Sequence, residues 1–321
     1  MNRAAVATLV MPFAAAAVFG ALVVATHHTT VPPLSPSAFA TPAPASTPAR
    51  CGREIVREPF AGIAVSRNVI AQVRVFRRAT GADIRLVAYS SPFTRPFNPH
   101  HAQQVAALGA LPLAQLDPRG ISLRRIADGR YNWLVRRYAD AVRAFGCRVV
   151  LSFGHDMNAW WNSWGMPHTR PATFIAAWRR IHDVFRQEGA GNVIWSWDPS
   201  HLEQQVPGKV ATSASEWYPG DAYVDWIGLD GSLGPGQTFD MAFGRQLDDI
   251  RRVTRKPVYL AATAVAAGKA QPRAITALFA AARRHHLIGL VWSDISGWQS
   301  AQLAGRPASL AAFRRAVAAL R

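Results

Sequence analysis

Cysteine is scarce in this 321-residue chain, which contains only Cys51 and Cys147. Two thiols are too few for a cysteine-only zinc cage, and the residues around Cys51 do not resemble a lipoprotein attachment sequence. The histidines form adjacent pairs at 100–101 and 285–286, and adjacent side chains point in different directions on a strand or a helix. We therefore expect neither a metal site nor a bound cofactor.

Acidic residues are scarce as well, with 19 Asp and Glu against 36 Lys and Arg and a net charge of +17. A protein surface with this excess of positive charge attracts anionic polymers. The arginines lie mostly in predicted helices, as at 178–187 and 251–256, and no basic run alternates with aromatic side chains that could stack on bases. The composition argues against nucleic acid as the partner and leaves other anionic polymers open.

Charged residues are also missing between positions 4 and 25, where an apolar run follows Arg3. As a helix this run would be about 33 Å long, which is enough to cross a bilayer and is expected of a secretory signal or an uncleaved anchor. Ala38 and Ala40 fit a cleavage site but lie far beyond the run, so both alternatives stay open. We expect an exported protein, either secreted or anchored to the membrane outside the cytoplasm.

Three parts of the chain follow from this composition. They are a signal peptide or anchor (1–30), a linker rich in Pro, Ala, Ser and Thr (31–50) and a folded domain (51–321). In an exported domain Cys51 and Cys147 can form a disulfide that ties the start of the domain to its middle. Two separate buried thiols are the alternative, and the sequence does not choose between them.

Eight short apolar runs alternate with amphipathic stretches after Phe60. The runs are rich in β-branched and aromatic residues without strict alternation, as expected for parallel strands buried on both faces. They lie at 60–65, 83–89, 111–116, 148–153, 192–197, 223–229, 257–262 and 289–294, and helices are expected around 67–79, 134–145, 174–185, 240–254, 271–286 and 307–320. This count and length predict an α/β fold of the (β/α)8 barrel type in a single domain. A doubly wound sheet is the alternative, but no Gly-rich phosphate turn follows the first run.

Polar side chains gather where the predicted strands end, which is where the site of such a barrel lies. The acids there are Asp117, Asp156, Asp198, Asp230 and Asp294, whereas the seventh strand ends in Ala261-Ala262-Thr263 without an acid. Aromatic residues lie around the same ring, at Trp160, Trp161, Trp164, Trp197, Trp217, Tyr218, Trp292 and Trp298. Carboxylates beside flat aromatic faces suit a sugar, because hydroxyls bond to the acids while ring C–H groups stack on indole. No G-x-S-x-G elbow of a serine hydrolase is present.

Several segments resemble glycoside hydrolase family 26, which includes β-mannanases. The stretch "FGHDMNAWWNSWG" (153–165) is similar to the family's HEMNG-x-W-x-x-WG sequence. "WYPGDAYVDWIGLDG" (217–231) is the most specific match, and "KPVYLAAT" (256–263) resembles KP-x-x-x-AET. The resemblance supports the barrel and implies a polysaccharide, neutral or anionic, as the partner.

The resemblance also implies the roles of individual positions. Family members use a glutamate after strand four as acid/base and a glutamate on strand seven as nucleophile, and these positions are Asp156 and Ala262 here. The family's strand-four arginine falls on Ser152. Together with the residues at the strand ends, the expected substrate-binding set is His155, Asn158, Trp161, Trp164, Asp117, Trp197, Asp230, Tyr218 and Trp292.

These departures lead to two functional hypotheses. The first is a family member that binds a β-linked polysaccharide of the mannan type or a related one but has lost classical retaining catalysis, because the methyl group of Ala262 cannot attack an anomeric carbon. The second is an active glycosidase or transglycosylase in which Asp156 is the acid and Asp230, Asp198 or Asp294 is a relocated base. A third hypothesis, an envelope adaptor in which the barrel is only a scaffold, rests on no particular motif.

Overall fold

Eight parallel strands close into a barrel in the order β1 to β8, each bonded to its neighbours along the chain and β1 to β8. The strands are β1 (Phe60–Ala64), β2 (Ile84–Pro92), β3 (Leu111–Asp117), β4 (Val149–Phe153), β5 (Val193–Trp197), β6 (Trp226–Leu233), β7 (Val258–Val265) and β8 (Gly289–Ser293). The computed structural model describes residues 51, 59–66, 69–201, 213–294 and 303–320. The predicted (β/α)8 barrel is confirmed, and the predicted signal and linker lie outside these residues.

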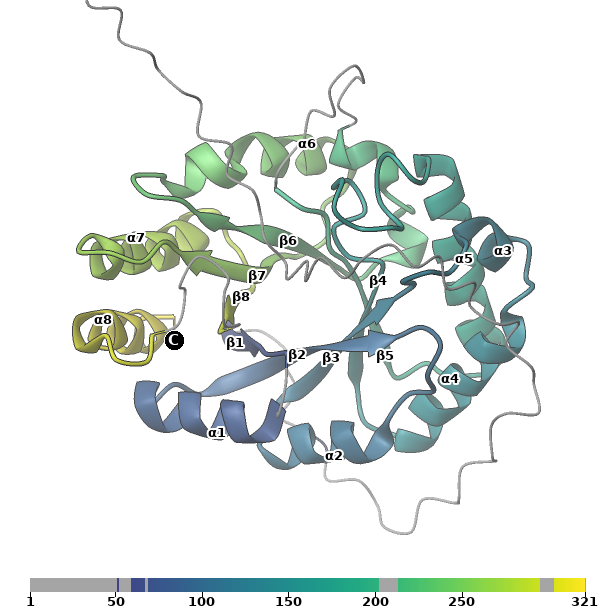
Figure 1. Ribbon diagram of the computed structural model, residues 1–321, viewed down its shortest axis with the longest axis horizontal. Coiled ribbons are helices and arrows are strands. Elements are labelled where there is room, and N and C mark those ends of the chain that lie inside the picture. Colours follow the sequence, from purple (N-terminus) through teal and green to yellow (C-terminus); the bar gives the residue numbers. More distant parts are fainter. Residues whose placement is uncertain (1–50, 52–58, 67–68, 202–212, 295–302, 321) are drawn as a thin grey trace, which may run out of the picture.

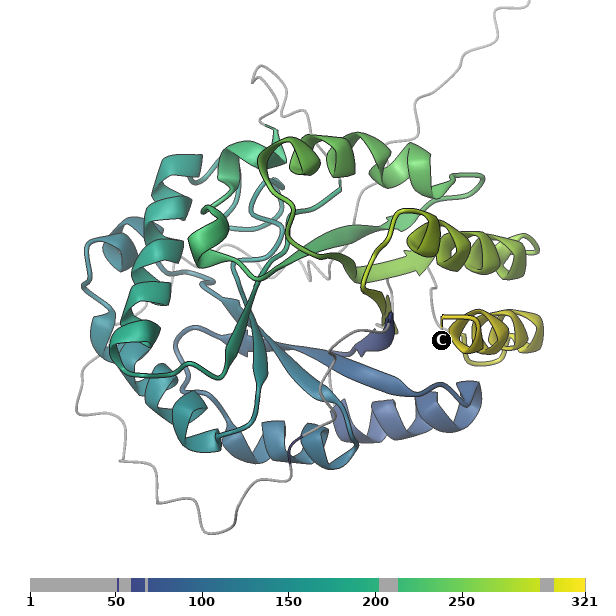
Figure 2. The ribbon, with the colours of Figure 1, turned by 180° about the vertical axis from the view of Figure 1, so that it is seen from behind.

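Helices surround the strands on the outside of the barrel (Figures 1 and 2). They are α1 (Val69–Thr80), α2 (Pro99–Ala107), α3 (Leu123–Ala127), α4 (Asn132–Phe145), α5 (Pro171–Gln187), α6 (Arg245–Val253), α7 (Gln271–Arg284) and α8 (Pro307–Ala318), with a π-helical turn η4 (Asp240–Gly244) before α6 and the short 3-10 turns η2 (Ala214–Trp217) and η3 (Asp221–Tyr223). No helix of the described part of the chain is long and apolar enough to cross a membrane.

Two helices that the sequence analysis left out are α2 and α3. Local signals for both are present: the Asn98 side chain accepts a hydrogen bond from the backbone of His101 at the start of α2, and Ser122 does the same for Arg125 in α3. Both helices are short, and the apolar face of α2 is largely alanine. Their weak periodicity explains why the sequence analysis missed them.

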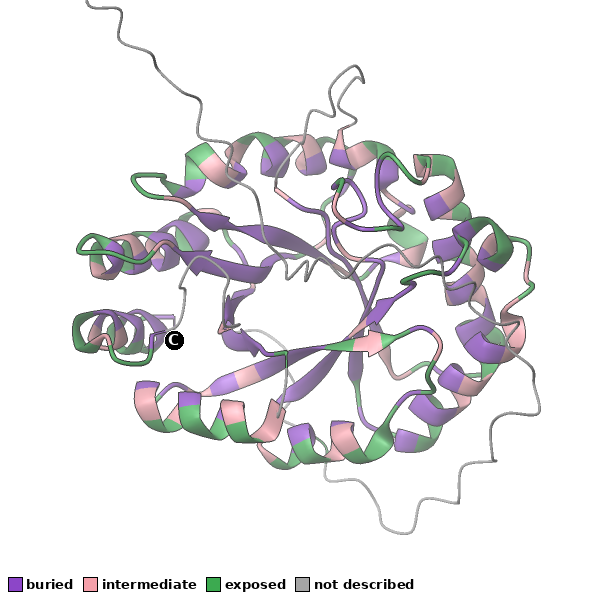
Figure 3. Ribbon diagram, in the orientation of Figure 1, coloured by how far each residue is buried: buried purple, intermediate pink, exposed green. Residues whose placement is uncertain are grey.

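The core has two layers, as a filled barrel requires. The larger lies between the strands and the surrounding helices, and its side chains include Phe153, Phe174 and Trp178. The smaller takes alternate strand residues, such as Leu86, Leu111 and Tyr259. Nearly every strand residue is buried, while the outer helix faces are exposed (Figure 3). The non-alternating apolar runs of the sequence follow from this burial on both faces.

A disulfide joins Cys51 to Cys147, 96 positions apart in the chain. Cys147 lies between the end of α4 and the start of β4, so the bond fastens the beginning of the domain to the barrel end where strands start. The end where strands finish, which carries the candidate site, is therefore left clear of this attachment.

Candidate functional site

Four aspartates meet at the carboxyl ends of neighbouring strands. Asp117 ends β3, Asp156 follows β4, Asp198 follows β5 directly, and Asp230 lies within β6. Backbone bonds connect these ends: the Asp156 N–H donates to the Asp198 carbonyl (2.8 Å). All four side chains are at most 8% exposed. The structure therefore brings together the acids that the sequence placed only on separate strands.

His155 supplies the positive charge of this cluster. Its Nδ1 lies 3.0 Å from Oδ1 of Asp117, whose other oxygen accepts a hydrogen bond from the Ser90 hydroxyl (2.6 Å). Burial lowers the pKa of His155, but the charge and hydrogen bond of Asp117, with further attraction from Asp156 and Asp230, raise it overall to about 10. The imidazole is thus a cation at neutral pH, and it offsets part of the surrounding negative charge.

Asp156 occupies a strained, buried position. Its backbone has φ 53°, in the left-handed region that non-glycine residues rarely adopt. Burial raises the pKa of its carboxyl to about 6, although the charge of His155 and the Trp161 indole lower it, while Asp198 and Asp117 add to the rise. Strain and a raised pKa in one carboxyl are typical of functional sites. Such an acid holds its proton at mildly acidic pH and is suited to donate it.

Asp230 lies beside Ala262, the residue at the expected nucleophile position. A bulge between Leu229 and Asp230 places Asp230 directly opposite Ala262 in the β6–β7 register. Burial raises the pKa of Asp230 well above its usual range, the charges of Asp156 and Asp198 raise it further, and the charge of His155 and the Ala262 N–H lower it. One Asp230 oxygen, Oδ1, has no hydrogen-bond partner. A carboxyl from the adjacent strand therefore lies next to the alanine.

The other two candidate bases have structural partners. Asp198 is fully buried and accepts a hydrogen bond from Ser196 (2.5 Å), with the Tyr259 hydroxyl 3.5 Å away. Its carboxyl also lies against Gly228, where any side chain would collide with it. Burial raises the pKa of Asp294 to about 6, and the backbone N–H of Leu303 lowers it. Asp230, by contrast, is the acid that pairs with Ala262 in the strand register.

Ser152, the expected position of the family's strand-four arginine, lies next to this cluster of acids. Ser152 is fully buried in β4, next to Ser196 of β5 in the register. Burial raises the pKa of Asp198 overall and the Ser152 hydroxyl lowers it in part, although neither this hydroxyl nor Oδ2 of Asp198 makes a hydrogen bond of full geometry. A neutral hydroxyl thus lies where the resemblance led us to expect a cationic side chain, and it adds no positive charge to offset the acids.

The predicted aromatic platform is smaller than the sequence indicated. Trp161 is half-buried and its indole faces the Asp156 carboxyl. Trp164, Trp197 and Trp292, by contrast, are at most 2% exposed. Trp164 donates to the His155 carbonyl (2.8 Å), Trp197 packs on Tyr218, and Trp292 packs on Phe313. These three rings belong to the core, and their faces are not open to a sugar because neighbouring side chains bury them.

Tyr218 and Asn158 also have structural contacts. The Tyr218 hydroxyl donates to Asp221 (2.6 Å) and lies 3.1 Å from the Thr254 hydroxyl. The Asn158 side chain makes two hydrogen bonds with the backbone of Ser200, each 2.8 Å long. Its Nδ2 donates to the Ser200 carbonyl, and its Oδ1 accepts from the Ser200 N–H. Asn158 is thus placed to position the loop after β5, which follows Asp198.

His201, which the sequence analysis did not single out, lies directly under Asp230. Its backbone N–H donates to the Asp230 carbonyl (2.7 Å) and its ring packs on Phe243. Gly231 has no space for a side chain because the His201 ring occupies it. Burial lowers the pKa of His201 to about 4, so the ring is neutral. The one signal in the sequence for this contact with Asp230 is the position of His201, three residues after Asp198 in the loop beyond β5.

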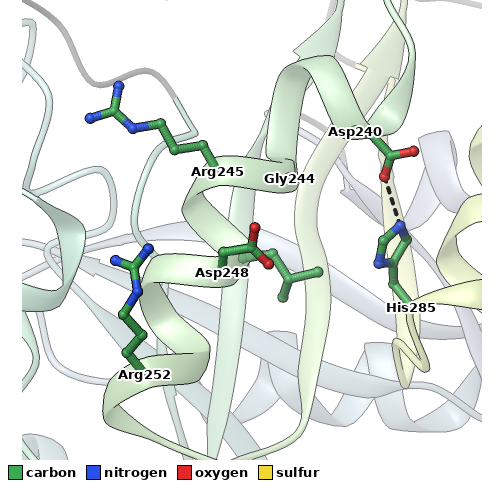
Figure 4. Close-up of a pocket in the computed structure, with 7 residues that line it drawn as sticks. Asp240, Gly244, Arg245, Asp248, Arg252 and His285 are labelled. Atoms are coloured by element: carbon green, nitrogen blue, oxygen red, sulfur yellow. Dashed lines mark hydrogen bonds and ion pairs between the residues drawn. The ribbon is translucent and has the colours of Figure 1, made fainter.

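A surface pocket of about 460 Å³ lies apart from this cluster, between η4, α6 and the end of α7 (Figure 4). Asp240 and His285 form an ion pair on one side of it (2.8 Å), and Arg245 and Arg252 extend from α6 on the other. None of the clustered acids lines this pocket. No group of three or more potential metal ligands occurs within the residues that the structure describes.

Comparison with known proteins matches this architecture. The family model "Glycosyl hydrolase family 26" matches residues 134–305, more than half of the chain. Endoglucanase H of Acetivibrio thermocellus is 29% identical over 252 residues, which cover 73% of this chain and 27% of that protein. β-1,3-Xylanase TXYA of a Vibrio species is 25% identical over 108 residues, covering 33% and 22%. The chain thus spans about a quarter of the length of these relatives.

Solved structures share the fold at low identity. An endo-β-1,4-mannanase from Cellulomonas fimi superposes with a TM-score of 0.62 and 16% identity, covering 81% of this chain and 70% of that one. A β-mannanase from Bacteroides ovatus gives 0.58 and 16%, covering 81% and 87%. These likenesses support the barrel. The chain belongs to glycosyl hydrolase family 26.

Proposed function

We propose that this family member binds a β-linked polysaccharide across the carboxyl ends of β3 to β7 and does not carry out double-displacement hydrolysis. Ala262 carries this proposal, since it stands at the strand-seven position where the family has its nucleophile. Relatives named endoglucanase, β-1,3-xylanase and β-mannanase support a β-linked glycan as the ligand. The acids at the strand ends and the half-buried Trp161 supply hydroxyl acceptors and one aromatic face.

The chemistry of retention explains why one alanine is decisive. A retaining glycosidase needs two carboxyls roughly 5 Å apart, one to donate a proton and one to form the glycosyl-enzyme intermediate. Ala262 can do neither, and Asp156 has a side chain one bond shorter than the family's glutamate. Ser152 adds to the loss because no cation stands at its position. The covalent route is therefore closed unless another carboxyl takes over.

Asp230 supports a second candidate, an inverting glycosidase. In that mechanism Asp156 donates a proton to the leaving oxygen while the second carboxyl activates a water on the opposite face of the sugar. The observation in its favour is the Asp230–Ala262 register, which brings a carboxyl with an unpartnered Oδ1 beside the alanine. Inversion tolerates a wider carboxyl separation, about 6.5–9.5 Å.

One experiment separates the two candidates. The full chain is incubated with mannan, β-glucan and xylan, with binding followed by affinity electrophoresis and cleavage by reducing-end release. Binding without reducing-end release, in the wild type as in Asp230→Asn, supports the binding protein. Cleavage that Asp156→Asn and Asp230→Asn both abolish, with an inverted anomer in the product by NMR, supports the inverting enzyme. Asp248→Asn, on the exposed outer face of α6, is the matched control. Failure to bind any β-linked polysaccharide would remove both candidates.

We further propose that residues 1–50 direct the domain out of the cytoplasm, where it is secreted or stays anchored. The disulfide between Cys51 and Cys147 supports export, because such bonds persist in oxidising compartments. Fractionation of cells that express the full chain tests this. A protein recovered only in the cytoplasm with both thiols free contradicts it, and recovery in the membrane rather than the medium identifies an anchor.

A further inference from the structure

The segment that leads from β2 through β3 to α3 is unusually basic for the rim of a sugar site. Between positions 93 and 127 it contains the arginines 95, 119, 124 and 125 and a single acidic residue, Asp117. Asp117 is buried and already bonded to His155 and Ser90. The four arginines are all exposed, and none makes an ion pair or a side-chain hydrogen bond within the described residues. Their positive charge is therefore available to a ligand.

Arg119 is the arginine that the structure connects to the site. It lies two residues beyond Asp117, and its guanidinium carbon stands 5.9 Å from the ring centre of Trp164. The other neighbour of that ring is His155, at 5.7 Å between ring centres. The Trp164 ring thus contacts both the exposed guanidinium of Arg119 and the imidazole of His155, which precedes Asp156 in the chain.

The contact with Trp164 gives Arg119 a defined place without using its hydrogen bonds. A guanidinium over an aromatic ring is held by cation–π attraction, while its N–H groups stay free for an acceptor. Those groups form a planar fork that matches a carboxylate in two parallel bonds. A neutral hydroxyl does not need such a fork. A guanidinium without an ion pair, two residues beyond Asp117 and stacked on Trp164, is suited to a carboxylated sugar unit next to the one at the centre.

We propose that Arg119 forms a subsite for a carboxylate of the bound glycan, so that the ligand is an acidic β-linked polysaccharide containing uronic acid. This rests on the proposed function, since it assigns the substrate class of the same site. The net charge of +17 agrees with it, because a basic protein surface draws a polyanionic chain toward the rim. His155, a cation at neutral pH, lessens the repulsion between that chain and the buried acids.

The test uses a matched pair of ligands: a β-linked exopolysaccharide containing glucuronate, and the same polymer with its carboxyls chemically reduced to alcohols. Both are titrated against the wild-type full chain, Arg119→Gln and Arg315→Gln. Arg315 is an exposed arginine of α8, on the opposite side of the barrel from α3 (Figure 1), and it controls for the loss of one positive charge. Melting temperatures confirm that each variant is folded.

We expect the wild type to prefer the acidic form by about tenfold, the effect of one charge-assisted contact at an exposed position. Arg119→Gln should lose that preference and bind both forms alike, whereas Arg315→Gln should keep it. An equal loss in both variants, or a wild type that binds the reduced polymer or neutral mannan as tightly as the acidic one, overturns the subsite and leaves the proposed function standing. A wild type that binds no β-linked polysaccharide at all removes both.

Discussion

Asp156→Asn should make the protein more stable at pH 8 while changing its stability little at pH 4. The carboxyl is buried and has a pKa of about 6 instead of 3.8. A rise of this size corresponds to a penalty of about 3 kcal/mol for the ionised form, since each pKa unit equals about 1.4 kcal/mol. Asparagine has nearly the same shape and no charge, so it removes the penalty.

The direction of the pH dependence follows from proton linkage. Between pH 4 and pH 6 the folded protein retains the Asp156 proton while the unfolded chain releases it, so stability falls as the pH rises through this range. Above pH 6 the full penalty of about 3 kcal/mol is present, and at pH 4 only about 0.5 kcal/mol remains. The variant should therefore gain stability over the wild type mostly between these two values.

Urea unfolding at pH 4 and pH 8, followed by tryptophan fluorescence, measures both free energies. Asp248→Asn, an exposed change on α6, should shift the free energy of unfolding by less than about 0.5 kcal/mol at either pH. A loss of stability in Asp156→Asn at pH 8, or the same gain at both pH values, would refute the reasoning. The first result would mean that the attraction of His155 outweighs burial; the second, that the carboxyl does not titrate in this range.

Three further predictions concern stability. Cys51→Ser should lower the free energy of unfolding by about 2–5 kcal/mol, because the disulfide closes a loop of 96 positions; a reducing agent should then have no further effect, and a further loss would contradict this. Asn158→Ala should cost about 2–4 kcal/mol in urea unfolding, since two backbone groups of Ser200 lose their partners; a neutral effect would mean that water replaces the amide. Gly231→Ala should displace the His201 ring and lower the melting temperature, whereas the double variant with His201→Ala should recover part of the loss.

The barrel was predictable because its signal is repeated along the sequence. Each strand is a buried apolar run and each long helix is an amphipathic stretch. The sequence analysis overlooked two short helices, α2 and α3, but the number of strands was still correct. The strand boundaries were less certain: β6 begins at Trp226 and extends to Leu233, beyond the expected 223–229. That extension places Asp230 within the strand and not after it, and it allows the pairing with Ala262.

The aromatic side chains show where sequence reasoning fails. Trp161 and Trp164 are three positions apart in one loop, and nothing in their spacing distinguishes the half-buried ring from the buried one. Their difference arises from contacts with residues distant in sequence, such as Arg119. Burial of an aromatic residue in a loop depends on which elements cover it, and that is decided only when the chain folds.

The sequence by itself determined the barrel and the family, because strand count and motif spacing are properties of a linear chain, and the resemblance assigned the expected nucleophile position to Ala262. Only the tertiary structure decided that Asp230 pairs with this alanine. A single bulged residue shifts the β6–β7 register, and a shift of one residue changes which side chains become neighbours. Such a shift leaves the hydrophobic pattern of both strands unchanged, so it cannot be seen before the strands pair.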